Sequence, residues 1–177
     1  MINGDPFDVS DIVKITVKVP EYAYKLVGRP FEMGASPRVN AQFSLQYCLA
    51  NALIRKSSKL EHFDPARIEN EAVADLISKI SVIPDATVEL RGHTAIDVEI
   101  TIGSGKVHQH GMDVAPGFPG NALTEEEHLQ HFENCLDYAP LCISKVKRAA
   151  ILDSITNLEA SDNVPDLITW TTTLQPA

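Results

Sequence analysis

The 177-residue sequence has few cysteines and no cysteine pair of metal-binding or redox spacing. Cys48, Cys135 and Cys142 are odd in number and far apart, and none belongs to a C-x-x-C pair. This pattern indicates neither a disulfide framework nor a zinc site. Because reduced cysteines are typical of the cytoplasm, we expect a cytoplasmic protein.

Long apolar runs and an excess of basic residues are also missing. No window approaches the ~18 apolar residues of a membrane helix, and the N-terminus lacks the basic and apolar regions of a secretory signal. Fifteen Lys and Arg face 24 Asp and Glu, which gives a net charge of −9. Such a charge repels nucleic acid and anionic lipid, so we expect neither as a partner.

Strand signals come from three stretches of the chain. Residues 12–19 (IVKITVKV) alternate, which places Val13 on the same buried face as Ile15, Val17 and Val19. Residues 93–103 and 106–114 form a predicted hairpin around the glycines of 103–105. Residues 80–83 predict a further short strand.

Helical patterns separate and follow these strands. Residues 41–54 predict one helix with little polar surface, and shorter helices are expected at 21–26 and after Asn70. Two more helices are expected after the capping box of Thr124 and Glu127 and from Ser144 to about residue 158. The fold class is therefore α+β, a small, mostly antiparallel sheet with packed helices. We expect a domain over 8–140 and, over 141–177, a C-terminal helix followed by a tail that begins at residue 163.

Histidine pairs are the first candidates for chemistry. His108 and His110 share a strand face, and His128 and His131 share a helix face. Neither spacing matches a known metal-ligand set, so no metal is predicted and solvent-facing histidines are the simpler interpretation. Cys48 lies in the most apolar helix, where burial makes a thiol inert. No phosphate-binding loop is present.

Polar residues gather at the start of the 41–54 helix. Gln42, Ser44, Gln46 and Tyr47 follow a loop rich in Gly and Pro. A helix N-terminus offers N–H groups to an anion, so carboxylate recognition is one interpretation. In the other, Ser44 and Gln42 satisfy the backbone of the first turn and Tyr47 packs with its hydroxyl at the rim. Spacing alone favours this local, structural role over carboxylate recognition.

The same residues carry a resemblance to a known family. NAQFSLQY at 40–47 resembles the A-K/Q-F-S-x-P/Q-Y helix of the MmgE/PrpD family, which includes 2-methylcitrate dehydratase, cis-aconitate decarboxylase and iminodisuccinate epimerase. Further segments are similar in the same order, from about Asp8 to Leu167: 11–19, 27–30, 80–84, 120–127 with Phe132, and 157–159. Their common order makes the set fairly specific.

The resemblance implies a two-domain enzyme without a cofactor that removes a proton next to a carboxylate of a small di- or tricarboxylate. A helical domain carries most of the catalytic residues, and an α+β lid closes over the cleft. This chain resembles the lid and the C-terminal helices that return to the helical domain. We therefore expect a truncated or separately encoded half that is inactive alone and forms a homo-oligomer. The alternative is a non-catalytic binding or dimerisation module with the lid fold.

The resemblance also assigns candidate site residues. Tyr47 matches the active-site-facing tyrosine of the family, a hydrogen-bond or proton-transfer partner. Gln42, Ser44 and Gln46 are its neighbours and become candidates for substrate binding. Because Gln42 stands where many members have Lys, we expect the positive charge for a polycarboxylate to come mostly from outside this chain.

Overall fold

The structure is a computed structural model that describes residues 7–139, 143–160 and 168. The chain divides into two compact units, residues 1–124 and 125–177, and each is described by itself. The predicted tail from residue 163 falls, apart from Ile168, outside the described residues, and so does Cys142. The predicted domain boundary after residue 140 stays a prediction.

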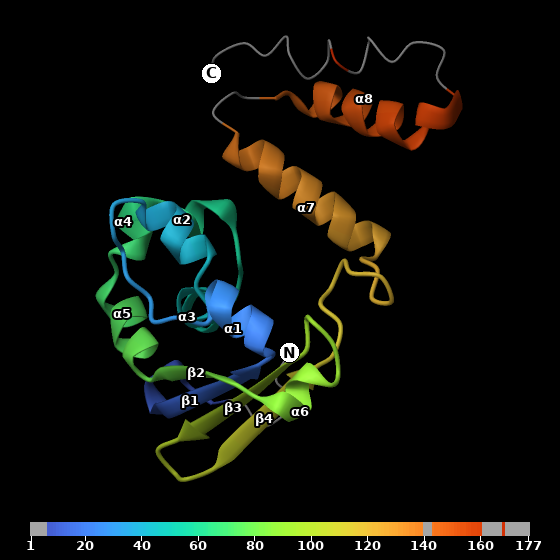
Figure 1. The fold of residues 1–177 in the computed structure, drawn as a ribbon. Coiled ribbons are helices and arrows are strands. Elements are labelled where there is room, and N and C mark those ends of the chain that lie inside the picture. Colours follow the sequence, from blue (N-terminus) through green and yellow to red (C-terminus); the bar gives the residue numbers. More distant parts are fainter. Residues whose placement is uncertain (1–6, 140–142, 161–167, 169–177) are drawn as a thin grey trace. The chain divides into compact units, whose positions relative to one another are not determined.

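A four-stranded mixed sheet forms the centre of the first unit (Figure 1). Its strands are β1 (Ile12–Val19), β2 (Ile80–Pro84), β3 (Ile96–Ile102) and β4 (Val107–Met112), in the order β2-β1-β3-β4. β1 pairs antiparallel with β3, and β3 with β4. β1 and β2 are parallel, and the helices between them form the long crossover that a parallel pair requires. The α+β class is confirmed.

One face of β1 differs from the simple alternation. Ile15, Val17 and Val19 are buried as expected, but Val13 is 59% exposed and Ile12 is buried instead. The pairing of β1 with β3 shifts register between Ile12 and Lys14, as in a β-bulge. A bulge adds one residue and turns the residues before it to the other face. The prediction of Val13 on the buried face was therefore wrong.

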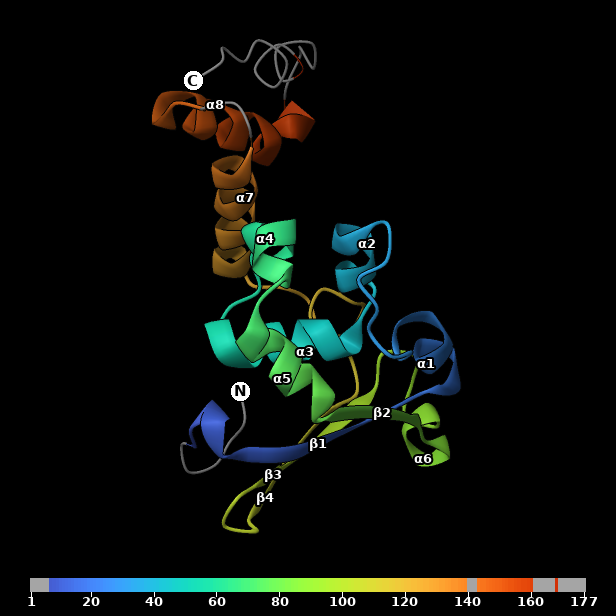
Figure 2. The same ribbon diagram turned by 90° about the vertical axis from the view of Figure 1, so that its left-hand side faces the viewer.

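Helices cover one face of the sheet. They are α1 (Glu21–Val27), α2 (Pro37–Gln42), α3 (Leu45–Arg55), α4 (Pro65–Ile68) and α5 (Glu71–Ser78), with 3-10 turns at Val9–Asp11 and Leu60–Phe63. Figure 2 shows α3 and α5 over this face, while α6 (Ala86–Glu89) follows β2. The core lies between the sheet and these helices and includes Ile15, Val17, Tyr47, Ala50, Val73 and Leu76.

The helix predicted over residues 41–54 is broken. α2 ends at Gln42, and Ser44 has extended backbone angles (φ −123°, ψ 115°). The Ser44 hydroxyl oxygen accepts the N–H of Tyr47 at 3.2 Å and so caps α3. Serine at this position satisfies a free N–H of the first turn, which favours a new helix start over continuation. The prediction of one continuous helix was therefore wrong.

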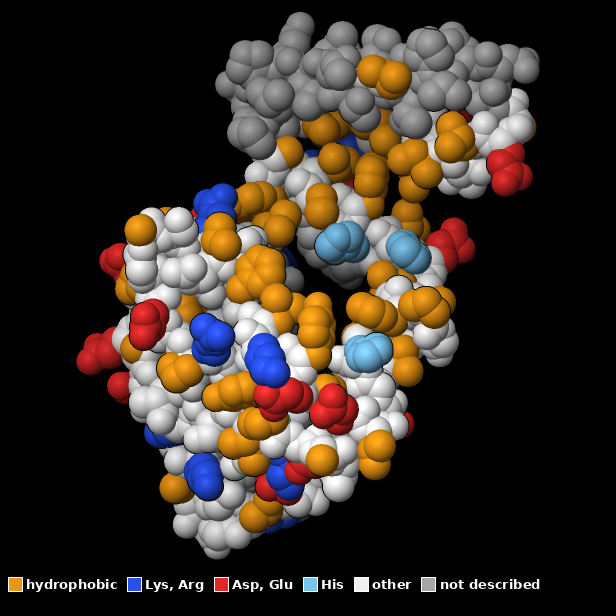
Figure 3. All heavy atoms as spheres, in the orientation of Figure 1, with side chains coloured by type: hydrophobic (Ala, Val, Ile, Leu, Met, Phe, Trp, Pro, Cys, Tyr) orange, Lys and Arg blue, Asp and Glu red, His pale blue; other side chains and the backbone are white. Residues whose placement is uncertain are grey.

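Apolar side chains remain exposed on α1 and α2. Tyr22 is 64% exposed, Leu26 52%, Val39 51% and Phe43 56%. Figure 3 shows exposed hydrophobic side chains over this part of the first unit. We call these four residues the α1–α2 apolar patch.

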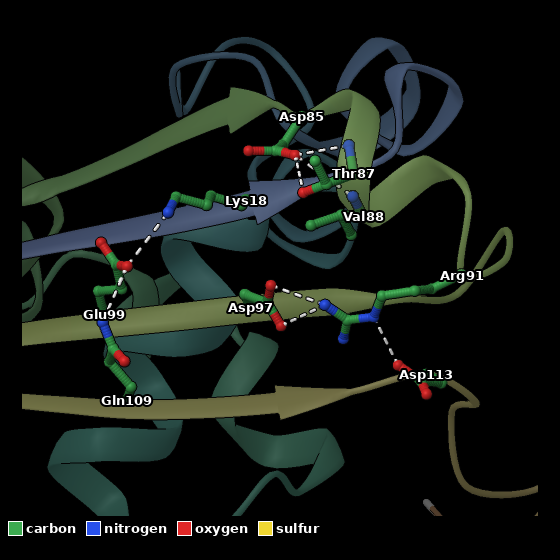
Figure 4. Close-up of polar contacts among 9 residues, drawn as sticks. All are labelled: Lys18, Asp85, Thr87, Val88, Arg91, Asp97, Glu99, Gln109 and Asp113. Carbon is green, nitrogen blue, oxygen red and sulfur yellow. Dashed lines mark hydrogen bonds and ion pairs between the residues drawn. The ribbon is translucent and has the colours of Figure 1, made fainter.

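The face of the sheet opposite the helices is polar, and its charges pair with one another (Figure 4). Lys18 contacts Glu99 at 3.1 Å, and Arg91 contacts both oxygens of Asp97 at 2.7 and 2.8 Å. A third contact, from Arg91 to Asp113 at 2.7 Å, helps to raise the pKa of Arg91 further. These ion-paired side chains thus neutralise much of one another's charge on the solvent face.

The second unit contains α7 (Glu125–Tyr138), α8 (Lys145–Thr156) and a 3-10 turn at Leu158–Ala160. Ser144 caps α8 as predicted, because its hydroxyl oxygen accepts the N–H of Lys147 at 3.3 Å. Arg148 of α8 contacts Glu133 and Asp137 of α7 at 2.5 and 2.7 Å, which raises the pKa of Arg148. None of the helices in the described part of the chain is long and apolar enough to cross a membrane.

Candidate functional site

A pocket of about 400 Å³ lies where the loop after α1 meets α2 and the start of α3. Its wall combines apolar side chains with one guanidinium, one carboxylate, one amide and one hydroxyl. The lining residues are Leu26, Arg29, Pro30, Phe31, Glu32, Asn40, Phe43 and Ser44. The volume suits a small ligand.

Two side-chain amides hold the loop that forms the pocket wall. Asn40 donates to the carbonyls of Glu32 and Met33 at 3.2 and 3.0 Å. Gln46 accepts the N–H of Phe31 at 2.7 Å and donates to the carbonyl of Ile80 at 2.7 Å. The loop is therefore tied to both α2 and β2.

The structure brings three of the four sequence-predicted site residues together around Phe31. Ser44 lines the pocket, and Gln46 fixes the Phe31 backbone. The Tyr47 ring packs against Phe31 with ring centroids 5.5 Å apart. Gln42 is exposed and is not among the lining residues.

Tyr47 is fully buried, and its hydroxyl points away from solvent. The hydroxyl donates to the backbone carbonyl of His62, and the Arg55 guanidinium lies 3.4 Å from the same oxygen. Arg55 also donates to Asn51. The phenol thus belongs to a buried polar network on one side of α3, rather than to the rim of the pocket.

His62 closes this network in its neutral form. Its Nδ1 accepts the backbone N–H of Lys59 at 3.3 Å and lies 3.4 Å from the Asn51 amide nitrogen. Burial, together with the nearby Arg55 charge, lowers the pKa of His62. Sequence reasoning missed this network, although Tyr47, Asn51 and Arg55 recur every four residues and so share a helix face.

Sequence reasoning also missed Arg29. It is exposed and lines the pocket, and the described residues give its guanidinium no hydrogen bond or ion pair. It lies in segment 27–30, whose resemblance to the family rests on its sequence pattern and gives no sign that the arginine lacks a partner. Arg29 supplies a positive charge to the pocket that Ser44 also lines.

The histidine and cysteine candidates lie elsewhere. His108 is 6% exposed and packs against Phe7 with ring centroids 4.8 Å apart, so its predicted solvent-facing position was wrong. His110, His128 and His131 are exposed as expected. Burial raises the pKa of the Cys48 thiol, in line with an inert cysteine. Within the described ranges, no group of three or more His, Cys, Asp or Glu could hold a metal ion.

The fold and the pocket define the first unit as an α+β domain whose helix-covered side carries a pocket of small-molecule size. The family model described as the MmgE/PrpD C-terminal domain matches residues 2–158. The chain therefore belongs to the MmgE/PrpD family and represents its C-terminal domain. No curated protein sequence matches it.

Proposed function

We propose that this chain is the lid domain of an MmgE/PrpD-type lyase or isomerase. Its substrate is a small di- or tricarboxylate, and the reaction begins with removal of a proton next to a carboxylate. Dehydration, decarboxylation and epimerisation all fit this description. The family match over 2–158 supports the proposal, together with a pocket of small-ligand size at the segment that resembles the family's active-site helix.

The single observation that carries the substrate class is the placement of Arg29 and Ser44 in one pocket. A carboxylate needs cationic or hydroxyl donors. Ser44 uses a lone pair to accept the Tyr47 N–H, so its own O–H is free to donate to a ligand. In a chain of net charge −9, a local cation of this kind is needed to hold an anion.

Tyr47 keeps its proposed catalytic role as hydrogen-bond or proton-transfer partner. That role requires its hydroxyl to exchange the His62 carbonyl for a substrate atom when the lid closes on the helical domain. Gln46 is a positioning residue in this account, because both ends of its amide are engaged by backbone groups. Gln42, exposed at the end of α2, would contact substrate only in the closed enzyme.

The test is turnover with and without a helical domain. The isolated chain is assayed on methylcitrate, cis-aconitate and iminodisuccinate, then mixed with a separately expressed helical domain of an MmgE/PrpD enzyme. We expect no turnover alone and turnover in the mixture. Turnover by the isolated chain would overturn the proposal that the main catalytic groups lie outside it.

A second candidate function is a non-catalytic binding or dimerisation module with the lid fold. The α1–α2 apolar patch favours it, because exposed apolar surface promotes association. Under either function we propose a cytoplasmic homo-oligomer. Size-exclusion chromatography with light scattering reports the association. A mixture that associates without turnover of any substrate would favour the non-catalytic module.

A further inference from the structure

We propose that Arg29 is the substrate-anchoring residue of this domain and binds one carboxylate of the ligand through its guanidinium. The inference rests on the proposed function and deepens it, because it names a residue of this chain that selects anionic substrates. Ser44 supplies the second donor in the same pocket. The sequence had suggested that the charge for a polycarboxylate would come mostly from elsewhere.

The backbone on both sides of Arg29 is held in place. Gly28 donates to the Tyr24 carbonyl at 2.9 Å, and a Cβ at Gly28 would lie only 2.7–2.9 Å from atoms of Tyr24. Pro30 has a restricted φ, and the N–H of Phe31 is bound by Gln46. Arg29 therefore lines the pocket from a fixed point of the backbone.

The charge of Arg29 is available to a ligand, unlike that of most other arginines in the described residues. Arg38 pairs with Asp64, Arg91 with Asp97 and Asp113, and Arg148 with Glu133 and Asp137. Arg55 is engaged in the buried network behind Tyr47. A planar guanidinium without a partner matches a carboxylate through two parallel hydrogen bonds.

Two larger hollows lined by described residues are less suited to an anion. In the hollow of about 720 Å³ between α7 and α8, Arg148 is already neutralised by two carboxylates. In the hollow of about 610 Å³ beside α5, Lys79 donates to the Ile12 carbonyl, and the charge of Lys56 acts on Asp8, which lines the hollow together with Asp75. The Arg29 pocket has one carboxylate, Glu32, which would repel an anionic ligand and limit its affinity.

The experiment is a ¹H–¹⁵N NMR titration of the full chain with citrate as the probe. We expect citrate to shift the amide signals of Phe31, Phe43 and Ser44. Arg29→Gln should weaken binding about tenfold or more, the loss of a charge-assisted hydrogen-bond pair. Glu32→Gln should strengthen binding, because it removes the repelling carboxylate.

Arg67→Gln is the matched control. Arg67 is exposed on α4, lies outside the pocket lining, and undergoes the same change of charge and shape. It should leave citrate binding unchanged. The role of Arg29 would be overturned by an equal loss of citrate affinity in both variants, by amide shifts that map away from the pocket, or by no citrate binding to the wild-type chain. Turnover in the mixture with a helical domain tests the proposed function independently, so the two failures are distinguishable.

Discussion

The side-chain amide oxygen of Gln46 accepts the backbone N–H of Phe31 at 2.7 Å. The amide nitrogen donates to the carbonyl of Ile80 in β2, also at 2.7 Å. One side chain thus connects the first turn of α3, the wall of the pocket and the edge of the sheet. The position of Arg29, two residues before Phe31, depends on this connection.

Replacing Gln46 should therefore destabilise the first unit. Gln46→Leu leaves a backbone N–H and a backbone C=O without partners, and we expect a loss of about 2–3 kcal/mol in the free energy of unfolding. Gln46→Glu retains the acceptor for Phe31 but loses the donor to Ile80 at neutral pH, so its loss should be smaller. Urea denaturation followed by circular dichroism measures both. Equal stability of Gln46→Leu and wild type would show that the two hydrogen bonds of the Gln46 amide contribute nothing to the free energy of unfolding.

Removal of the Tyr47 hydroxyl should affect both stability and turnover. Tyr47→Phe leaves the His62 carbonyl without its buried donor, which should cost about 1–2 kcal/mol. In the mixture with a helical domain, the same variant should lower kcat by about a hundredfold if the phenol transfers or holds a proton.

Tyr22→Phe is the control for this variant, because Tyr22 is 64% exposed and makes no described hydrogen bond. Tyr22→Phe should change neither the free energy of unfolding nor kcat in the mixture. A folded Tyr47→Phe variant with wild-type kcat would leave Tyr47 a purely structural residue.

His62 should make stability depend on pH. Burial and Arg55 lower its pKa in the folded state below the ordinary value of about 6.5, so the unfolded chain takes up a proton first as the pH falls. The stability that the neutral His62 contributes is fully present above about pH 6.5 and is lost as the pH falls toward the lowered pKa. The free energy of unfolding should fall by up to about 1.4 kcal/mol per pH unit in this range.

His62→Asn keeps an acceptor near the position of Nδ1 but cannot titrate. Urea denaturation of this variant and of wild type between pH 5 and 8 should show a steeper loss for wild type below about pH 6.5. Parallel curves for the two proteins would contradict a neutral, buried His62.

Gly111 should tolerate a methyl group only when Asp97 is changed as well. A Cβ at Gly111 would lie 2.5 Å from a carboxylate oxygen of Asp97, which Arg91 holds in place. We expect Gly111→Ala to cost about 1 kcal/mol, the size of an ion pair at the surface. In an Asp97→Ala background this cost should vanish, and a double-mutant cycle measures the difference. Additive effects of the two substitutions would exclude the clash.

The elements of this fold were predictable where one local signal dominated. Alternation in 12–19 gave β1 its bounds, and capping side chains placed the starts of α5 at Asn70 and α8 at Ser144. The register shift after Ile12 was not predictable, because it depends on pairing with β3, which is distant in sequence. The same holds for the parallel pairing of β1 with β2.

The candidate site shows a similar limit. The sequence located the start of α3 as the region of interest, but the apolar pattern of 41–54 concealed the break at Ser44. Burial of Tyr47 and His108 depends on contacts with Phe63 and Phe7, which no local pattern contains. Arg29 was missed because its significance comes from lacking a partner, and pairing can be judged only in three dimensions.

The assignment of this chain as a lid domain is tested most sharply by turnover after the chain is mixed with the helical domain of an MmgE/PrpD enzyme. We expect no conversion of methylcitrate, cis-aconitate or iminodisuccinate by either part alone and conversion of at least one by the mixture. Formation of a stable complex without conversion of any of the three would contradict a lid that completes a carboxylate-processing active site.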